Sequence, residues 1–248
     1  MRKPLHIIVL CLALTCCRQQ SDTGGLNIAV SHSANGQEIA LDTVFYVNEA
    51  GNRFTVSEIQ YFISNIGLQN EKGEWAAIDT GHNTHYIDTD IAESKSLVFS
   101  DIKADRYTKI RFTFGLDEAD NATGRFNNPP EANMFWPEPL GGGYHYMKLN
   151  GKWLDDEGHL QPMNIHLGIG QDSTLTEFYH NHFQVELPID INIVEDRRAD
   201  LQLNMLIDNW FKSPNTINLA EYGSAIMQNQ TAQSLFKANG NDVFQIMP

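Results

Sequence analysis

The sequence has few cysteines and few basic residues, and both shortages exclude classes of protein. All three cysteines, Cys11, Cys16 and Cys17, lie near the N-terminus of the 248-residue chain. The rest of the chain therefore cannot build a disulfide framework, a cysteine-based zinc site or a thiolate nucleophile. Lys and Arg total 17 against 31 Asp and Glu, which gives a formal net charge of −14. Nucleic acids and anionic membrane surfaces attract cationic proteins, so we expect no nucleic-acid partner.

Compact enzyme motifs are also missing. The chain has no nucleophile elbow, P-loop, HExxH or dinucleotide-binding glycine fingerprint. The adjacent carboxylates Asp155 and Asp156 are typical of a solvated turn. Asp117, Asp120 and Asn121 offer oxygen ligands for calcium, but their spacing is not that of an EF-hand loop. We therefore expect a binding protein and not an enzyme.

The N-terminus has the features of an export signal. Arg2 and Lys3 precede an apolar stretch over 7–14 that is too short to span a bilayer. The run ends in Leu14-Thr15-Cys16-Cys17, which resembles a bacterial lipobox. We expect residues 1–16 to be a lipoprotein signal peptide, Cys17 to carry the lipid and residues 17–25 to form a polar tether. An ordinary secretory signal is the alternative. With a lipidated Cys17, we expect the protein in the bacterial cell envelope, anchored to the bilayer and facing the periplasm or the cell exterior.

Residues 26–248 have the pattern of one all-β domain. Short runs rich in Val, Ile, Phe, Tyr and Thr alternate apolar and polar residues, as half-buried strands do. Helical spacing of apolar residues is limited to 224–238, where Gly240 follows as a stop. We predict a single antiparallel β-sandwich with a short C-terminal helix. The clearest strand segments are 26–30, 40–47, 54–67, 107–116, 143–149, 163–167, 178–187 and 200–207.

Histidine is the most informative residue type. Within strand-like segments, His180 and His182 are two residues apart and so share a face, His145 stands near Met147, and His166 precedes Leu167. Imidazoles and a thioether on rigid strands, without thiolates, suit copper better than magnesium or calcium. A histidine in a strand is, however, often a hydrogen-bonded structural residue. We interpret the remaining histidines of the domain as surface, strand-end or turn residues: His32, His82, His85 and His159.

An irregular segment over 127–144 separates two of the expected strands. It contains four prolines and the run Gly141-Gly142-Gly143, which exclude regular structure through most of it. It also contains the apolar triplet Met134, Phe135 and Trp136. On chemistry alone, such a triplet is favoured to fold back onto the core as a plug, and part of a binding site is the alternative.

Several motifs in this region resemble those of the MbnP family of copper-binding proteins. The resemblance covers most of the chain from about Leu26, and the strand ending at Asp117 and segments 211–214 and 239–244 also fit the family's layout. It implies a copper protein whose partner is a di-haem enzyme of the MauG or cytochrome c peroxidase type. The motifs are Met134-Phe135-Trp136-Pro137, Gly143-Tyr144, Met147-Lys148-Leu149-Asn150-Gly151 and His166-Leu167-Gly168.

The resemblance also implies a set of ligands. In characterised relatives the partner oxidises a tryptophan to kynurenine, and copper, as Cu(I), is held by two histidines and the kynurenine amino group. Trp136 matches that tryptophan and His166 matches one histidine. Glu138 stands where some relatives have the second histidine, so His145 is the nearest substitute. His180 and His182 are the reserve candidates for the second histidine ligand.

These observations predict a lipid-anchored copper-binding protein that acts in copper acquisition, storage or delivery. The loop is expected to hold Trp136 at the surface, where oxidising equivalents from the partner reach it, and the acidic surface would attract a basic haem protein. The main alternative is a lipoprotein that binds carbohydrate or protein by stacking an exposed Trp136 on its ligand. A copper oxidase is a third interpretation, but no substrate pocket is evident in the sequence.

Overall fold

The computed structural model describes residues 22–79, 81–171 and 177–247. The predicted signal peptide and Cys17 lie outside these residues. The strands are β1 (Thr23–Ala34), β2 (Gln37–Glu38), β3 (Tyr46–Val47), β4 (Arg53–Asn70), β5 (Trp75–Ala77), β6 (Thr84–Asp88), β7 (Ser96–Lys103), β8 (Asp105–Phe114), β9 (Met147–Leu154), β10 (Leu160–Leu167), β11 (Gly170–Gln171), β12 (Phe178–Tyr179), β13 (Phe183–Ile193), β14 (Arg198–Leu206) and β15 (Phe244–Met247).

Helical segments are short and gather late in the chain. None of those in the described ranges is long and apolar enough to cross a membrane. They comprise the α-helices α1 (Leu219–Tyr222) and α2 (Gln230–Asn239) and the 3₁₀ turns η1 (Ala92–Lys95), η2 (Glu131–Met134), η3 (Glu138–Leu140), η4 (Ile207–Phe211), η5 (Ile226–Gln228) and η6 (Gly240–Asp242).

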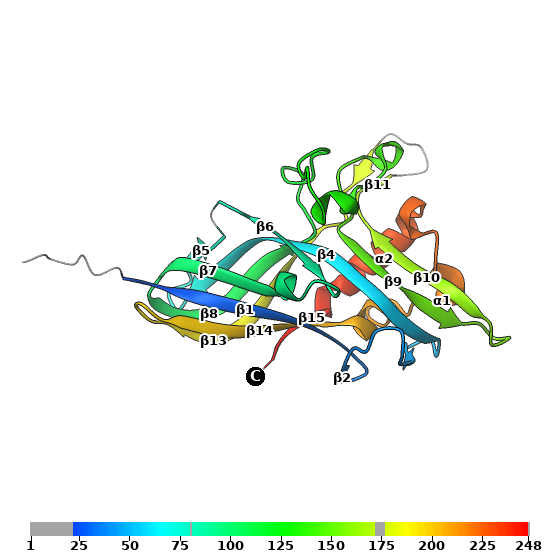
Figure 1. Ribbon diagram of the computed structural model, residues 1–248, viewed down its shortest axis with the longest axis horizontal. Coiled ribbons are helices and arrows are strands. Elements are labelled where there is room, and N and C mark those ends of the chain that lie inside the picture. Colours follow the sequence, from blue (N-terminus) through cyan, green and yellow to red (C-terminus); the bar gives the residue numbers. More distant parts are fainter. Residues whose placement is uncertain (1–21, 80, 172–176, 248) are drawn as a thin grey trace, which may run out of the picture.

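The strands form two main sheets, which confirms the predicted all-β sandwich (Figure 1). One sheet has the order β15-β14-β1-β2, with β7 also paired to β1. The other has the order β10-β9-β4-β8-β13, with β3, β5 and β6 on β4. Pairing is antiparallel except between β1 and β14, which run parallel. Phe244 of β15 packs across the sandwich against Phe112 of β8, with ring centroids 5.1 Å apart, so the core lies between the two sheets.

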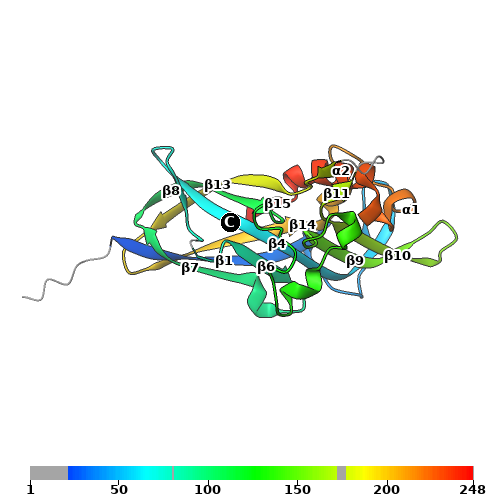
Figure 2. The same cartoon turned by 90° about the horizontal axis from the view of Figure 1, so that it is seen from above.

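The predicted C-terminal helix is α2, and it closes one end of the sandwich. Asn229 caps it by accepting a hydrogen bond from the Ala232 backbone N–H, and the Phe236 side chain is buried beneath it. Its buried Gln233 accepts a hydrogen bond from the Gly168 N–H and donates one to the His166 carbonyl. Figures 1 and 2 place α1, α2 and β11 at the end that carries β9 and β10, whereas β1 begins at the other end.

Some predicted boundaries were wrong. The first strand begins at Thr23, so the last three residues of the predicted tether belong to the domain. In segment 40–47 only Tyr46 and Val47 are in a strand, and β9 begins at Met147. The cause of the late start is local, because Gly141, Gly142 and Gly143 all have left-handed backbones, with φ of 115°, 68° and 78°. Strands β6 and β7 were missed, as were the short strands β2, β5, β11 and β15.

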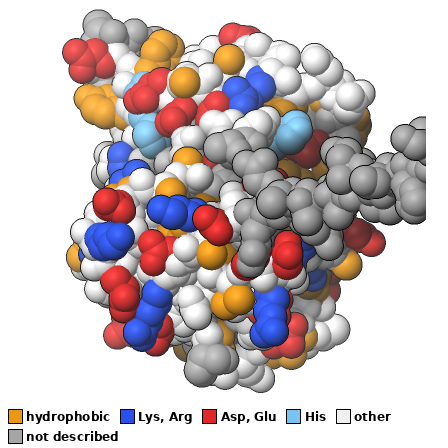
Figure 3. Space-filling model, turned by 90° about the vertical axis from the view of Figure 1, so that its left-hand side faces the viewer, with side chains coloured by type: hydrophobic (Ala, Val, Ile, Leu, Met, Phe, Trp, Pro, Cys, Tyr) orange, Lys and Arg blue, Asp and Glu red, His pale blue; other side chains and the backbone are white. Residues whose placement is uncertain are grey.

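Charged side chains are spread over the sheets as pairs of opposite sign. Arg106 of β8 forms ion pairs with Glu71 and with Asp190 of β13, and Lys109 pairs with Glu186. On the end of the molecule shown in Figure 3, Asp and Glu side chains are mixed with Lys and Arg. The net acidity therefore does not gather into one patch on that face.

Candidate metal centre

The four predicted histidine ligands fall into two groups. His145 and His166 lie edge to face with ring centroids 5.1 Å apart, and His145 lies 4.7 Å from the indole of Trp136 in the same manner. His180 and His182 have their ring centroids 5.8 Å apart. The structure therefore brings His145 and His166 together with Trp136 and places the two reserve histidines in a cluster of their own.

Trp136 is a buried plug between η2 and η3. Its backbone N–H donates to the Gly143 carbonyl at 2.8 Å, and its indole N–H donates to the Leu140 carbonyl at 3.2 Å. The indole packs against Gly168, where an added Cβ would lie 2.6 Å from a ring carbon. The side chain is 0% exposed, so the expectation of a surface tryptophan was wrong and the plug interpretation is confirmed.

The burial of Trp136 follows from the alternation of inward and outward side chains along its segment. The loop pairs with the chain that enters β9 through an isolated bridge between Phe135 and Tyr144, and this extended pairing sends neighbouring side chains to opposite sides. Met134 and Trp136 point into the protein, while Phe135 is 47% exposed. A sugar cannot stack on Trp136 in this position, so the alternative that depended on its exposure loses its main support.

His145 has one ring nitrogen bound and one free. Its Nδ1 lies 2.9 Å from the carbonyl oxygen of Met134. A carbonyl only accepts hydrogen bonds, so Nδ1 carries the proton and Nε2 keeps its lone pair. This Nε2 is buried and has no hydrogen-bond partner among the described residues. Burial lowers the pKa of His145 to about 3, and the imidazole is neutral at physiological pH.

His166 repeats this arrangement from the neighbouring strand pair. It lies on β10, and its Nε2 is 2.8 Å from Oδ1 of Asn150 on β9. Asn150 donates its own amide N–H to Glu58, which turns its oxygen toward the imidazole. Nε2 of His166 therefore donates, and Nδ1 keeps a lone pair. Burial, helped by the charge of Lys148, lowers the pKa of His166 to about 4.

Among the described residues, no carboxylate forms an ion pair with either imidazole. The charged side chain that lowers the pKa of both is Lys148, whose Nζ donates to the Asn133 carbonyl at 2.8 Å. A cavity of about 470 Å³ beside η5 opens at His166, and its lining includes Asn164, Ile226 and Met227. The centre thus offers two neutral nitrogen donors, an adjoining indole and an access route.

The second group faces a carboxylate that the sequence did not single out. Oε1 of Glu118 lies 3.7 Å from Nε2 of His180 and 3.6 Å from Nε2 of His182. Burial lowers the pKa of His182, while a hydrogen bond from its own backbone N–H, followed by the two imidazoles, lowers the pKa of Glu118. The prediction that His180 and His182 share one strand was wrong. Strand β12 ends at Tyr179 and β13 begins at Phe183, so both histidines lie between the two strands.

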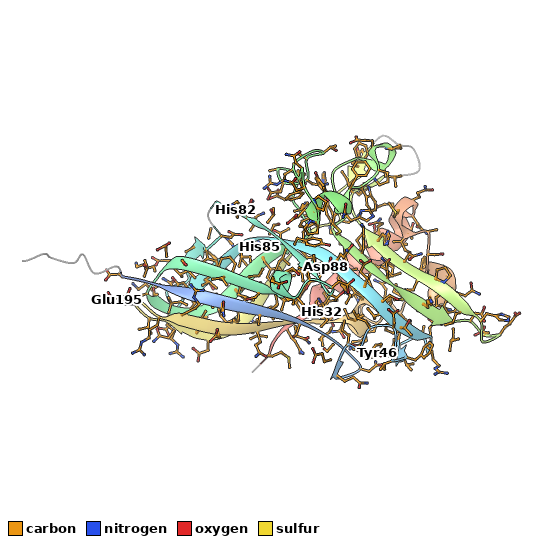
Figure 4. The ribbon with its side chains drawn as sticks, viewed as in Figure 1. His32, Tyr46, His82, His85, Asp88 and Glu195 are labelled. Atoms are coloured by element: carbon orange, nitrogen blue, oxygen red, sulfur yellow. The ribbon has the colours of Figure 1, made fainter. Side chains whose placement is uncertain are left out.

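The remaining histidines lie away from both groups, and one was misplaced. His32 is not in a turn but buried in β1, where its Nε2 lies 3.1 Å from the Tyr61 hydroxyl. Figure 4 shows it well apart from His82 and His85, which belong to the β6 side of the molecule. His85 is half-buried, His82 is exposed, and the His159 side chain is 67% exposed in a turn.

The calcium ligands that the sequence offered are engaged within the protein. Asp117 accepts hydrogen bonds from the backbone N–H groups of Ala119 and Asp120. Asp120 itself pairs with Arg125 at 2.9 Å and accepts a hydrogen bond from Asn83. Their oxygens are therefore satisfied by protein donors.

Comparison with known proteins supports the earlier resemblance. The chain is similar in fold to the solved structure of MbnP from Methylosinus trichosporium, with a TM-score of 0.59 over 90% of this chain and 98% of that chain, at 12% sequence identity. No curated protein is significantly similar in sequence. The family model for MbnP matches residues 23–229, well over half of the chain. The protein therefore belongs to the MbnP family.

Proposed function

We propose that this protein binds copper(I) through His145 and His166 and carries it as cargo for acquisition, storage or delivery. One observation carries the proposal: each imidazole has one nitrogen engaged by a fixed oxygen acceptor, which leaves the other nitrogen free for a metal. Such outer hydrogen bonds fix the tautomer and raise the basicity of metal-binding histidines. Membership of the MbnP family supports a copper-related function in general.

The charge and the donor types favour the monovalent ion. Copper(I) accepts few ligands and borderline donors such as imidazole. A divalent ion buried here would lack an anionic partner and would lie near the ammonium of Lys148. Because both histidines are already neutral, binding copper requires little displacement of protons.

Trp136 completes the proposed site after oxidation. An indole N–H is only a donor and has no lone pair for a metal. Conversion to kynurenine removes four electrons, takes oxygen from water and releases ring carbon C2 as formate, and it leaves an aromatic amine on the side chain that contacts His145. Because Trp136 is buried, we propose that its oxidation proceeds by electron transfer to a di-haem partner docked near the exposed Phe135, and not by direct contact with the haem.

The proposed place of action is the cell envelope, with the protein anchored to a bilayer through lipidated Cys17. This follows from the lipobox-like sequence at Leu14–Cys17. We propose a binding protein and not an enzyme, because the free nitrogen of His145 is buried beside Trp136, where it can reach an ion more readily than an organic substrate. The net charge of −14 would steer a basic haem partner toward it.

The proposal is tested by copper(I) titration against a chromophoric chelator, with His166→Ala and His159→Ala compared. His159 is an exposed histidine beside carboxylates and provides the matched control. We expect His166→Ala to weaken binding by at least about tenfold, in line with the loss of a metal ligand, and His159→Ala to leave it unchanged. Equal binding by the two variants would exclude this site.

Oxidation of Trp136 is tested separately on protein purified from its native membrane. Kynurenine contains one oxygen more and one carbon less than tryptophan, so the peptide containing Trp136 would show that change in mass. Copper measured in the same sample relates the modification to occupancy. An unmodified Trp136 in copper-loaded protein would remove kynurenine from the proposed ligand set but keep the histidines.

A further inference from the structure

We propose that Glu118, His180 and His182 form a second metal site, one that takes a divalent ion such as Zn²⁺ and is independent of the copper centre. One ligand atom from each residue can be chosen so that all three lie within 4.8 Å of one another. Nε2 of His182 is buried without a hydrogen-bond partner in the described part of the chain, and Nε2 of His180 faces the same carboxylate. Two histidines and one carboxylate are a common ligand set for zinc.

The separations fit a shared metal better than they fit hydrogen bonds. Nε2 of each imidazole lies 3.6–3.7 Å from the same carboxylate oxygen of Glu118, too far for a hydrogen bond. Tetrahedral zinc with ligands at about 2.0–2.1 Å holds neighbouring ligand atoms about 3.3 Å apart. Each imidazole would therefore move only a few tenths of an ångström toward Glu118 to share an ion with that carboxylate.

The two histidines are held in place by the residue between them. Asn181 is 1% exposed and donates a hydrogen bond to the Gly168 carbonyl at 2.8 Å. Asn181 points inward, whereas the imidazoles of His180 and His182 both face Glu118. Lys237 of α2 fixes the same turn by donating to the His180 carbonyl at 2.7 Å. The ligands are thus presented by a backbone that is already anchored on both sides.

Glu118 is presented by a rigid turn at the end of β8. Gly115 precedes it with a left-handed backbone (φ 87°) and packs so closely on Tyr146 that a Cβ would lie 2.7 Å from that ring. The same Tyr146 ring lies 6.0 Å from the ring of His182. Because the Glu118 side chain is 63% exposed, an ion reaches the site from solvent.

The two sites differ in charge, and this difference separates their metals. The copper centre has neutral donors and a nearby cation, whereas the second site has an anion facing both imidazoles. A carboxylate stabilises the second positive charge of Zn²⁺, and open solvent completes its coordination. The second site therefore selects the divalent ion and exchanges it readily.

Zinc titration of metal-free protein against a chromophoric chelator tests this proposal. We expect one Zn²⁺ per chain both in the unmodified sequence and in His166→Ala, where the copper centre is disabled. Glu118→Gln preserves the size of an exposed side chain and should weaken zinc binding at least about tenfold. His182→Ala should abolish zinc binding. X-ray absorption of the zinc-loaded parent protein should show two imidazole ligands.

His159→Ala is the matched control, because His159 also lies beside carboxylates, at 3.4 Å from Glu157 and 3.7 Å from Asp155. The Asp155 carboxylate already accepts hydrogen bonds from Gln161 and two backbone N–H groups. We therefore expect His159→Ala to leave zinc binding unchanged.

Unchanged zinc binding in Glu118→Gln would overturn the second site. Loss of zinc in His166→Ala would show that zinc occupies the copper centre, which would also overturn it while leaving the proposed function intact.

Discussion

The contact between Gly168 and Trp136 gives the sharpest test of how the copper centre is packed. Gly168→Ala would place a methyl carbon 2.6–2.8 Å from three atoms of the indole, well inside van der Waals contact. The indole cannot yield easily, because it is fully buried and its N–H is bound to the Leu140 carbonyl. Gly168 has an ordinary backbone conformation, so the effect comes from crowding and not from backbone strain.

Overpacking of this kind costs about 1–3 kcal/mol of folding free energy. For a domain of this size, each kcal/mol lowers Tm by about 2–4 °C, so calorimetry should show a fall of several degrees. Gly67→Ala is the control, since the nearest atom to its Cβ would be the Ala76 carbonyl oxygen at 3.1 Å, with Arg111 Nε next at 3.6 Å. A Gly168→Ala protein that melts within a degree of the parent would show that the indole is free to move, and would refute the reasoning.

Two further predictions follow from hydrogen bonding and burial. Asn150→Leu removes the acceptor that holds Nε2 of His166, and we expect copper(I) affinity to fall by about 10–100-fold in chelator competition, while zinc binding at Glu118 stays constant. Burial also lowers the pKa of His32 to about 3, so the unfolded chain takes up protons below about pH 6.5 before the folded chain does. Stability should therefore decline from pH 6.5 toward pH 4, and it should decline less steeply in His32→Phe. An equal fall of Tm with pH in the two proteins would contradict this.

Local patterns were sufficient to predict most of the framework. Alternation of Ile110, Phe112 and Phe114 marks β8, and the spacing of Ala232, Leu235 and Phe236 marks α2. The same patterns failed at 143–146, where all four residues are buried and three left-handed glycines precede the strand. Apolar alternation alone cannot show where backbone hydrogen bonding begins.

The candidate site was predicted in its members but not in its arrangement. His145, His166 and Trp136 could be named from motifs, yet the burial of Trp136 depends on Gly168, which is far along the chain. Glu118 was missed because a lone glutamate in a turn has no local signal. Its proximity to His180 and His182 arises only when β8 and β13 pair, with Phe114 opposite Phe183.

The parallel pairing of β1 with β14 has a consequence for the way this chain is made. Residues 25–33 lie in register with residues 198–206, so the N-terminal strand has no partner on that side until the last quarter of the chain has emerged. Closing so long a loop is entropically costly and slow, which delays completion of this sheet. A chain that emerges N-terminus first would thus complete this sheet only after residue 206 has emerged, and its sandwich would close late.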